Sequence, residues 1–210
     1  MNNFIRDEAS CYLTDAVILA TLIRSGGESP AQALTRATRL LATAGGSLRR
    51  VVEADATALG DTAHNRVQAA FELVRRVMEE QLRRENCLNS PQDVKRYLAT
   101  RLRDAQREIF AVLFLDTRHR LMVFEELCYG TIASATVPPR VVAQRALRHN
   151  AAAVIVAHNH PSGVAEPSEA DRTLTRHLAQ ALQLVEIALL DHIVVGDGEW
   201  VSFAERGLLF

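Results

Sequence analysis

Two histidines one residue apart, His158 and His160, follow a short apolar run in the segment VIVAHNHPSGVAEPSEAD. Residues 154–156 are β-branched and precede a loop that contains proline and glycine, a pattern that predicts a buried strand. Side chains two positions apart on a strand point to the same face of the sheet. We therefore expect the two imidazoles to emerge side by side at the strand end, where they could carry out chemistry.

A carboxylate follows at Asp171, eleven residues after His160. Two histidines and one carboxylate leave the fourth tetrahedral position of a zinc ion to water, which is typical of a catalytic rather than a structural zinc site. Zinc lowers the pKa of its bound water from about 15.7 to about 7. A further carboxylate would then be needed to move the proton.

Ser168 and Asp171 also have a purely structural interpretation. In PSEAD they match a capping box, with Ser168 as the N-cap and an acid three residues later. Taken by themselves, these two residues favour the cap. The two roles are compatible, because a helix that begins beside a metal would fix the direction in which the carboxylate points.

The elements that must position these residues can be read from apolar periodicity and turn signals. The sequence predicts helices over 12–24, 29–46, 47–55 and 65–86. After a polar segment at 86–93 it predicts a helix over 91–105, strands over 108–116 and 121–130, a helix over 138–150, a strand over 152–158, a helix over 168–184 and two strands within 187–203. We place a domain boundary at this polar segment, giving a helical domain over 1–88 and an α/β domain over 89–210, with helices against a central sheet.

The composition excludes several classes of protein. The chain has 210 residues, 48% hydrophobic and 23% charged, with a net charge of −1, and so lacks the basic excess of a protein that grips a phosphate backbone. Cys11, Cys87 and Cys128 form no C-x-x-C pair, so we expect idle thiols rather than a cysteine zinc site or a disulfide framework. We find no apolar segment of the roughly 18 residues that a membrane span needs and no signal peptide, so a cytoplasmic location is expected.

The segment HNHPSGVAEPSEAD resembles the JAMM signature of the JAB/MPN metalloprotease superfamily, with every defining position filled. Residues from about 90 to 210, including EIFAVLFLD, VPPRVVAQRAL and LLDHIVVG, resemble the bacterial RadC family, and the helical section resembles the N-terminal region of that family more loosely. The resemblance implies an MPN-type sheet flanked by helices, preceded by a small helix-hairpin-helix-like domain. It also implies a zinc-dependent metallopeptidase that cleaves a peptide or isopeptide bond.

The resemblance also assigns roles to residues. It implies one zinc ion held by His158, His160 and Asp171, and a glutamate at the start of an earlier strand as the general base. Glu108 fits this position best, since it opens the first predicted strand, and Glu125 and Glu126 are the alternatives. Ser168 would donate a hydrogen bond to the developing oxyanion.

Three further residues match positions of the family: Asp191, His192 and Arg140. Asp191 and His192 either orient a zinc histidine or are strand-end residues bonded to backbone, and the second interpretation is favoured. Arg140 is expected to form an ion pair at the start of a helix. The remaining histidines are expected to be surface residues: His64, His119, His149 and His177.

The first domain departs from the family pattern. Gly60 is present, but the second glycine of the usual Gly-x-Gly turn is missing, and Asp61 would place a negative charge near any phosphate. We therefore expect a degenerate hairpin used for packing or protein contacts. Two alternatives to a hydrolase are a DNA-associated protein and an interaction scaffold with an idle metal site. A gel shift with duplex and branched DNA tests the former, since phosphate contacts are strongest at low salt, about 50 mM.

Overall fold

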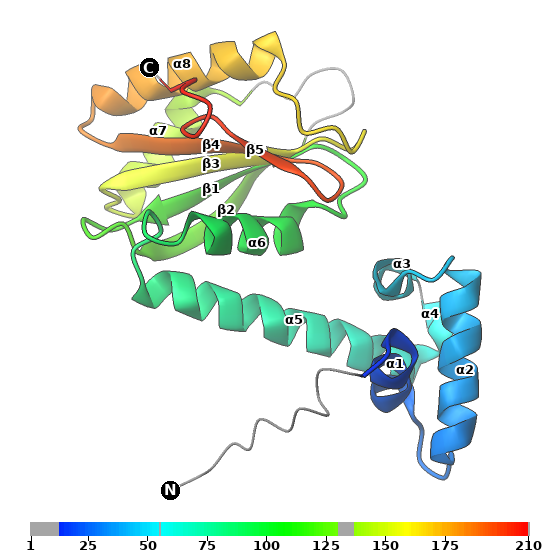
Figure 1. Cartoon of the computed structure of the whole chain (residues 1–210). Coiled ribbons are helices and arrows are strands. Elements are labelled where there is room, and N and C mark those ends of the chain that lie inside the picture. Colours follow the sequence, from blue (N-terminus) through cyan, green and yellow to red (C-terminus); the bar gives the residue numbers. More distant parts are fainter. Residues whose placement is uncertain (1–12, 55, 130–136, 210) are drawn as a thin grey trace, which may run out of the picture. The chain divides into compact units, whose positions relative to one another are not determined.

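The computed structural model describes residues 13–54, 56–129 and 137–209. The chain separates into two compact units, Met1–Val74 and Arg75–Phe210, and the division falls inside helix α5 (Asp61–Arg84) (Figure 1). The domain boundary that composition places after residue 88 remains a prediction. None of the helices in the described ranges combines the length and the apolar character needed to cross a membrane.

Short helices make up the described part of the first unit. They are α1 (Asp15–Ile23), α2 (Pro30–Thr43), α3 (Leu48–Glu53), α4 (Ala56–Leu59) and the start of α5. Ser29 and Gln32 form a capping box at the start of α2, with Pro30 in its first turn. The predicted helices over 12–24, 29–46 and 47–55 are thus present with shorter ends.

The segment around Gly60 is more helical than the sequence suggested. Helix α4 was not predicted, because a single turn gives too little periodicity to recognise. Gly60 has a φ of +80°, which favours glycine, and it joins α4 to α5. Helix α5 begins at Asp61, four residues earlier than predicted. Whether this region is a degenerate helix-hairpin-helix remains a prediction.

The second unit is built on a five-stranded sheet. Its strands are β1 (Ile109–Leu115), β2 (Leu121–Tyr129), β3 (Ala153–Asn159), β4 (Ala188–Val195) and β5 (Trp200–Ser202), in the order β2-β1-β3-β4-β5. Strands β3 and β4 are parallel, and the other neighbours are antiparallel. Strands β1 and β3 are buried along their whole length, which explains why both read as continuous apolar runs.

Helices cover both faces of this sheet (Figure 1). Helix α6 (Pro91–Leu102) and the end of α5 pack on one face, while α7 (Pro139–Arg148) and α8 (Glu169–Gln183) pack on the other. Alternate residues of β1 serve the two cores: Ala111 and Leu113 face α6, whereas Phe110 and Val112 face α7 and α8. The predicted α/β architecture, a sheet flanked by helices, is confirmed at this level.

Candidate metal centre

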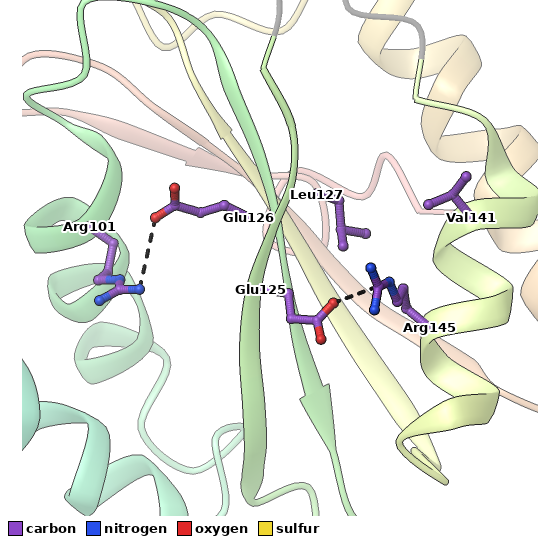
Figure 2. Close-up of a pocket in the computed structure, with 6 residues that line it drawn as sticks. All are labelled: Arg101, Glu125, Glu126, Leu127, Val141 and Arg145. Atoms are coloured by element: carbon purple, nitrogen blue, oxygen red, sulfur yellow. Dashed lines mark ion pairs between the residues drawn. The ribbon is translucent and has the colours of Figure 1, made fainter.

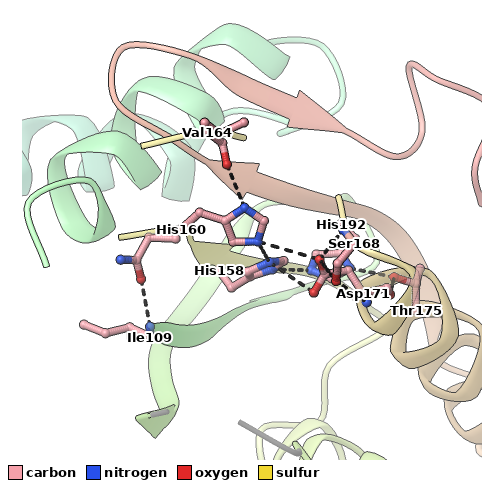
Figure 3. Close-up of polar contacts among 9 residues, drawn as sticks. Ile109, His158, His160, Val164, Ser168, Asp171, Thr175 and His192 are labelled. Atoms are coloured by element: carbon pink, nitrogen blue, oxygen red, sulfur yellow. Dashed lines mark hydrogen bonds and ion pairs between the residues drawn. The ribbon is translucent and has the colours of Figure 1, made fainter. Parts of the chain in front are cut away.

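The His-x-His pair lies at the end of strand β3, with His158 inside the strand and His160 one residue beyond its last residue. His158 is buried and pairs with Phe110 of β1 and Val194 of β4. The extended chain continues one step beyond the strand, since the backbone N–H of His160 donates to the carbonyl of Val195 at 2.9 Å. The two Nε2 atoms lie 3.0 Å apart, so the rings are side by side as predicted (Figure 3).

Asp171 meets these rings from the first turn of α8. Its Oδ2 accepts hydrogen bonds from the backbone N–H of Ser168 at 2.7 Å and from the Ser168 hydroxyl at 2.6 Å, completing the predicted capping box. The same carboxylate lies 3.3 Å from Nε2 of His158 through Oδ1 and 3.6 Å from Nε2 of His160 through Oδ2. The cap and the approach to the histidines therefore coexist.

The three potential ligand groups have a spacing close to that of a tetrahedral zinc site. Nε2 of His158 lies 3.0 Å from Nε2 of His160 and 3.3 Å from Oδ1 of Asp171, and Nε2 of His160 lies 3.6 Å from Oδ2 of Asp171. Ligands about 2.0–2.1 Å from a zinc ion in tetrahedral geometry lie about 3.3–3.4 Å from one another. Within the described residues, no other group of three His, Cys, Asp or Glu side chains converges in this way. The donor set fits a single divalent cation.

The electrostatics of the cluster reflect this convergence. Burial alone would raise the pKa of Asp171, but its close contacts with His158 and His160 outweigh burial and hold the pKa well below its ordinary value. The pKa of His160 is raised, chiefly by its hydrogen bond to Asp171, with a smaller contribution from the charge of Glu108. Asp171 and His160 thus each favour the charged form of the other.

His192 contacts the metal centre, contrary to the favoured expectation. Its Nε2 lies 2.8 Å from Nδ1 of His158, and its Nδ1 lies 2.6 Å from the hydroxyl of Thr175. His192 is fully buried, and burial lowers its pKa. Asp191 behaves as favoured: it accepts backbone hydrogen bonds from His192 and Ala204, and one from the hydroxyl of Ser202.

Glu108 lies on the same side of the sheet as the histidines. It precedes β1 by one residue, and β1 pairs Phe110 with His158, so by alternation Glu108 shares their face. Its side chain is half-buried, and its charge contributes to the raised pKa of His160.

Glu125 and Glu126 lie on β2, at the sheet edge, and face different helices (Figure 2). Glu125 is 3.6 Å from Arg145 of α7 and 2.6 Å from Nε2 of His149, whereas Glu126 is 3.8 Å from Arg101 of α6. Both carboxylates are half-buried. They border an open pocket of about 460 Å³, which also includes Leu127 and Val141.

Asn159, between the two histidines, points to the opposite face and was not singled out from the sequence. Its buried amide accepts a hydrogen bond from the backbone N–H of Ile109 at 2.7 Å. It donates to the carbonyls of Ala105 and Arg107 at 3.2 and 3.1 Å. Asn159 therefore fixes the segment that carries Glu108.

The turn between β4 and β5 supports the loop that follows His160. The backbone N–H of Asp197 donates to the carbonyl of Gly163 at 2.7 Å, and that of Ala165 donates to the carboxylate of Glu199 at 2.9 Å. The approach is close at Gly196, where an added Cβ would lie 2.4 Å from the Gly163 oxygen. This position therefore requires glycine.

The other residues singled out from the sequence lie away from these contacts. Arg140 is exposed in the first turn of α7 and forms no ion pair with another described residue, so the expected pair is absent there. His177 is exposed as predicted, but His149 is half-buried against Phe114 and bonded to Glu125. His64 and His119 are also half-buried rather than exposed.

Two of the three cysteines can be placed, and Cys11 lies outside the described residues. Cys87 and Cys128 are free thiols. Burial raises the pKa of Cys87 to about 11, which keeps the thiol protonated and unreactive at neutral pH. This agrees with the predicted idle role.

A sheet covered by helices on both faces, with a His-x-His pair at a strand end and an aspartate in the first turn of the next helix, defines a JAB-type domain. The family model of the RadC-like JAB domain matches residues 88–208. The chain belongs to the RadC family.

Relatives extend the similarity over nearly the whole chain. A UPF0758 protein of Nitrosococcus oceani is 53% identical over 203 residues, which cover 94% of this chain and 90% of the relative. A UPF0758 protein of Ectopseudomonas mendocina is 49% identical over 206 residues, or 95% and 91% of the two chains. A third, from Vibrio parahaemolyticus, is 49% identical over 201 residues, or 93% and 89%. The similarity thus includes the helical first unit, which the family model does not cover.

Proposed function

We propose that this protein is a zinc-dependent metallopeptidase-like hydrolase that cleaves a peptide or isopeptide bond. The observation that carries the proposal is the convergence of two imidazole nitrogens and one carboxylate within 3.0–3.6 Å of one another. A zinc ion held by His158, His160 and Asp171 would supply a Lewis acid and a water ligand of lowered pKa.

Glu108 is proposed as the group that moves the proton. It is half-buried on the face of the sheet that carries the histidines, so its carboxylate can accept a proton from a water beside His160. After the carbonyl carbon has been attacked, the same carboxyl group would return the proton to the leaving amine nitrogen. Glu125 and Glu126 are less suited to this role, because each is already paired with a cation from α7 or α6.

Ser168 is proposed as the donor to the carbonyl oxygen when that oxygen gains negative charge. Its hydroxyl donates to Asp171 in the substrate-free structure, at 2.6 Å. A hydroxyl hydrogen rotates freely, so it can exchange this acceptor for a substrate oxyanion. Asp171 would keep the hydrogen bond from the backbone N–H of Ser168, and so would stay in place.

The ligand set is tested by the metal content of protein purified without added metal. We expect about one zinc per chain in the parent and a large loss in His158→Ala and Asp171→Ala, because three protein ligands are needed to hold the ion. His149→Ala is the matched control, since it removes a half-buried histidine bonded to Glu125 instead. The same trace of zinc in parent and variants would refute the site.

Hydrolysis is tested separately, with zinc-loaded protein and a panel of linear and isopeptide-linked peptides. We expect cleavage by the parent and none by Asp171→Ala. A parent that holds zinc but cleaves no member of either class would favour the idle scaffold instead.

A further inference from the structure

A row of buried hydrogen bonds links α8 to the first histidine of the pair. The hydroxyl of Thr175 lies 2.6 Å from the carbonyl oxygen of Asp171, one turn earlier in the helix. The same hydroxyl lies 2.6 Å from Nδ1 of His192, and Nε2 of His192 lies 2.8 Å from Nδ1 of His158. Thr175, His192 and His158 are all buried, so no solvent competes for these contacts (Figure 3).

The chemistry of the groups fixes the direction of each hydrogen bond. A carbonyl oxygen can only accept, so the hydroxyl of Thr175 donates to Asp171. Its oxygen must therefore accept from Nδ1–H of His192. A buried imidazole whose two nitrogens face uncharged groups stays neutral, so Nε2 of His192 carries no proton and accepts from Nδ1–H of His158.

We propose that Thr175 and His192 are positioning residues that hold His158 in the tautomer protonated at Nδ1. The Nε2 of His158, which takes no part in this row of hydrogen bonds, then faces His160 and Asp171 and is the nitrogen left to bind a cation. The link to zinc rests on the proposed function, but the position of the proton is a property of this chain alone.

His160 reaches the same state by a different route. Its Nδ1 lies 2.7 Å from the carbonyl oxygen of Val164, so Nδ1 must donate and Nε2 is left for the centre. Among the described residues, no backbone carbonyl bonds to Nδ1 of His158. This nitrogen instead contacts His192 of β4, which contacts Thr175 of α8 in turn.

Helix α8 therefore contributes to the centre twice. Asp171 supplies a carboxylate, and Thr175, one turn later on the same helix, sets the proton on a histidine of β3. Without the Thr175 hydroxyl, the Nδ1–H of His192 has no acceptor, and the ring can take the other tautomer. His192 would then donate to His158, whose own proton would move to Nε2 and occupy the ligand atom.

The tautomers are measured directly by imidazole ¹⁵N chemical shifts in zinc-free parent protein. We expect a proton on Nδ1 of both His158 and His192, and an unprotonated Nε2 on His192. A His158 ring without a proton on Nδ1 would overturn the proposal. The readout involves no metal and no activity, so it separates the two ideas: a parent with these tautomers that binds no zinc refutes the proposed function alone.

Zinc affinity, measured by competition with a chelator, tests the consequence. Thr175→Val keeps the shape of the side chain but removes the hydroxyl, and we expect zinc to bind about 10- to 100-fold more weakly, the usual loss when a group supporting a ligand is removed. Thr175→Ser keeps the hydroxyl and should restore parental affinity. Equal affinities for the valine and serine variants, at similar thermal stability, would overturn the proposal.

Discussion

Charged and polar side chains gather at two places in the second unit, and the two clusters differ in how their charges are matched. Around β2, each acid faces its own base: Glu126 faces Arg101, and Glu125 faces Arg145 and His149 (Figure 2). At the end of β3, two imidazoles and a carboxylate turn their ligand atoms toward one another, and their ion pairs within the described part of the chain include no arginine or lysine.

This difference in charge matching indicates which cluster is suited to bind a cation. The acids at β2 are already neutralised, although they border the open pocket of about 460 Å³. The cluster at β3 brings several lone pairs together, and only a proton or a metal ion can offset their mutual repulsion. The candidate metal centre is therefore identified by its unmatched acceptor atoms, and not by the volume of a neighbouring pocket.

The largest difference between the two clusters is expected when one carboxylate near each of them is replaced by its amide. Glu108→Gln should lower the rate of hydrolysis by about 10²- to 10⁴-fold, the usual contribution of a proton-transfer group, without loss of zinc. Glu125→Gln should leave the rate close to that of the parent. Steady-state kinetics with a peptide that the parent cleaves provide the measurement. A larger loss in the Glu125 variant would move the general base to β2.

Ser168→Ala sharpens the distinction between binding the metal and stabilising the transition state. The variant should retain zinc, because Asp171 keeps its backbone hydrogen bond. It should lose about 2.7–4 kcal/mol of transition-state stabilisation, the cost of removing one oxyanion donor. Ser162→Ala, in the neighbouring exposed loop, is the control. Equal turnover numbers for Ser168→Ala and the parent would remove the role of this serine.

Thermal unfolding with added zinc measures how much each cluster contributes to the stabilisation of the fold by the ion. At free zinc 100 times above Kd, the parent should gain about 2.7 kcal/mol in unfolding free energy, because the ion binds the folded chain only. Asp171→Asn should gain much less, whereas Glu126→Gln should gain as much as the parent. An identical zinc-induced rise in Tm for Asp171→Asn would place the bound ion elsewhere.

The smallest effect is expected at β2 itself. Arg101 and Glu126 are partly exposed and 3.8 Å apart, so solvent screens their attraction. Glu126→Gln should therefore change the free energy of unfolding by less than about 1 kcal/mol, measured by urea denaturation. A loss of several kcal/mol would mean that this pair is as strongly coupled as the cluster at β3.

The sequence predicted most elements because periodicity and turn residues act locally. The buried runs of β1 and β3 and the capping box at Ser168 were recognisable for this reason, and so was the His-x-His spacing. The contact between His158 and His192 was one of two alternatives for His192, and the sequence favoured the other. The contact depends on the parallel pairing of β3 with β4, where His192 lies opposite Val156. Periodicity gives the face of a strand but not its partner across the sheet.

Helix α8 illustrates the same limit. The sequence indicated that Ser168 and Asp171 could cap the helix, but it could not show whether the carboxylate also turns toward the histidines. That direction depends on how α8 packs on the sheet, through residues such as Leu178 and Leu182. Likewise, the half-buried His149 follows from the position of Glu125 on an edge strand.

The amide of Asn159 makes a shift in the pairing of β1 with β3 costly. Its neighbours on either side are the paired histidines, and its own hydrogen bonds hold the backbone on both sides of Glu108. If the pairing of β1 with β3 shifted by one residue, Glu108 would move away from the two imidazoles. The Asn159 amide would then lose all three of its hydrogen bonds. The side chain of Asn159 thus fixes the register between two segments that are fifty residues apart in the chain.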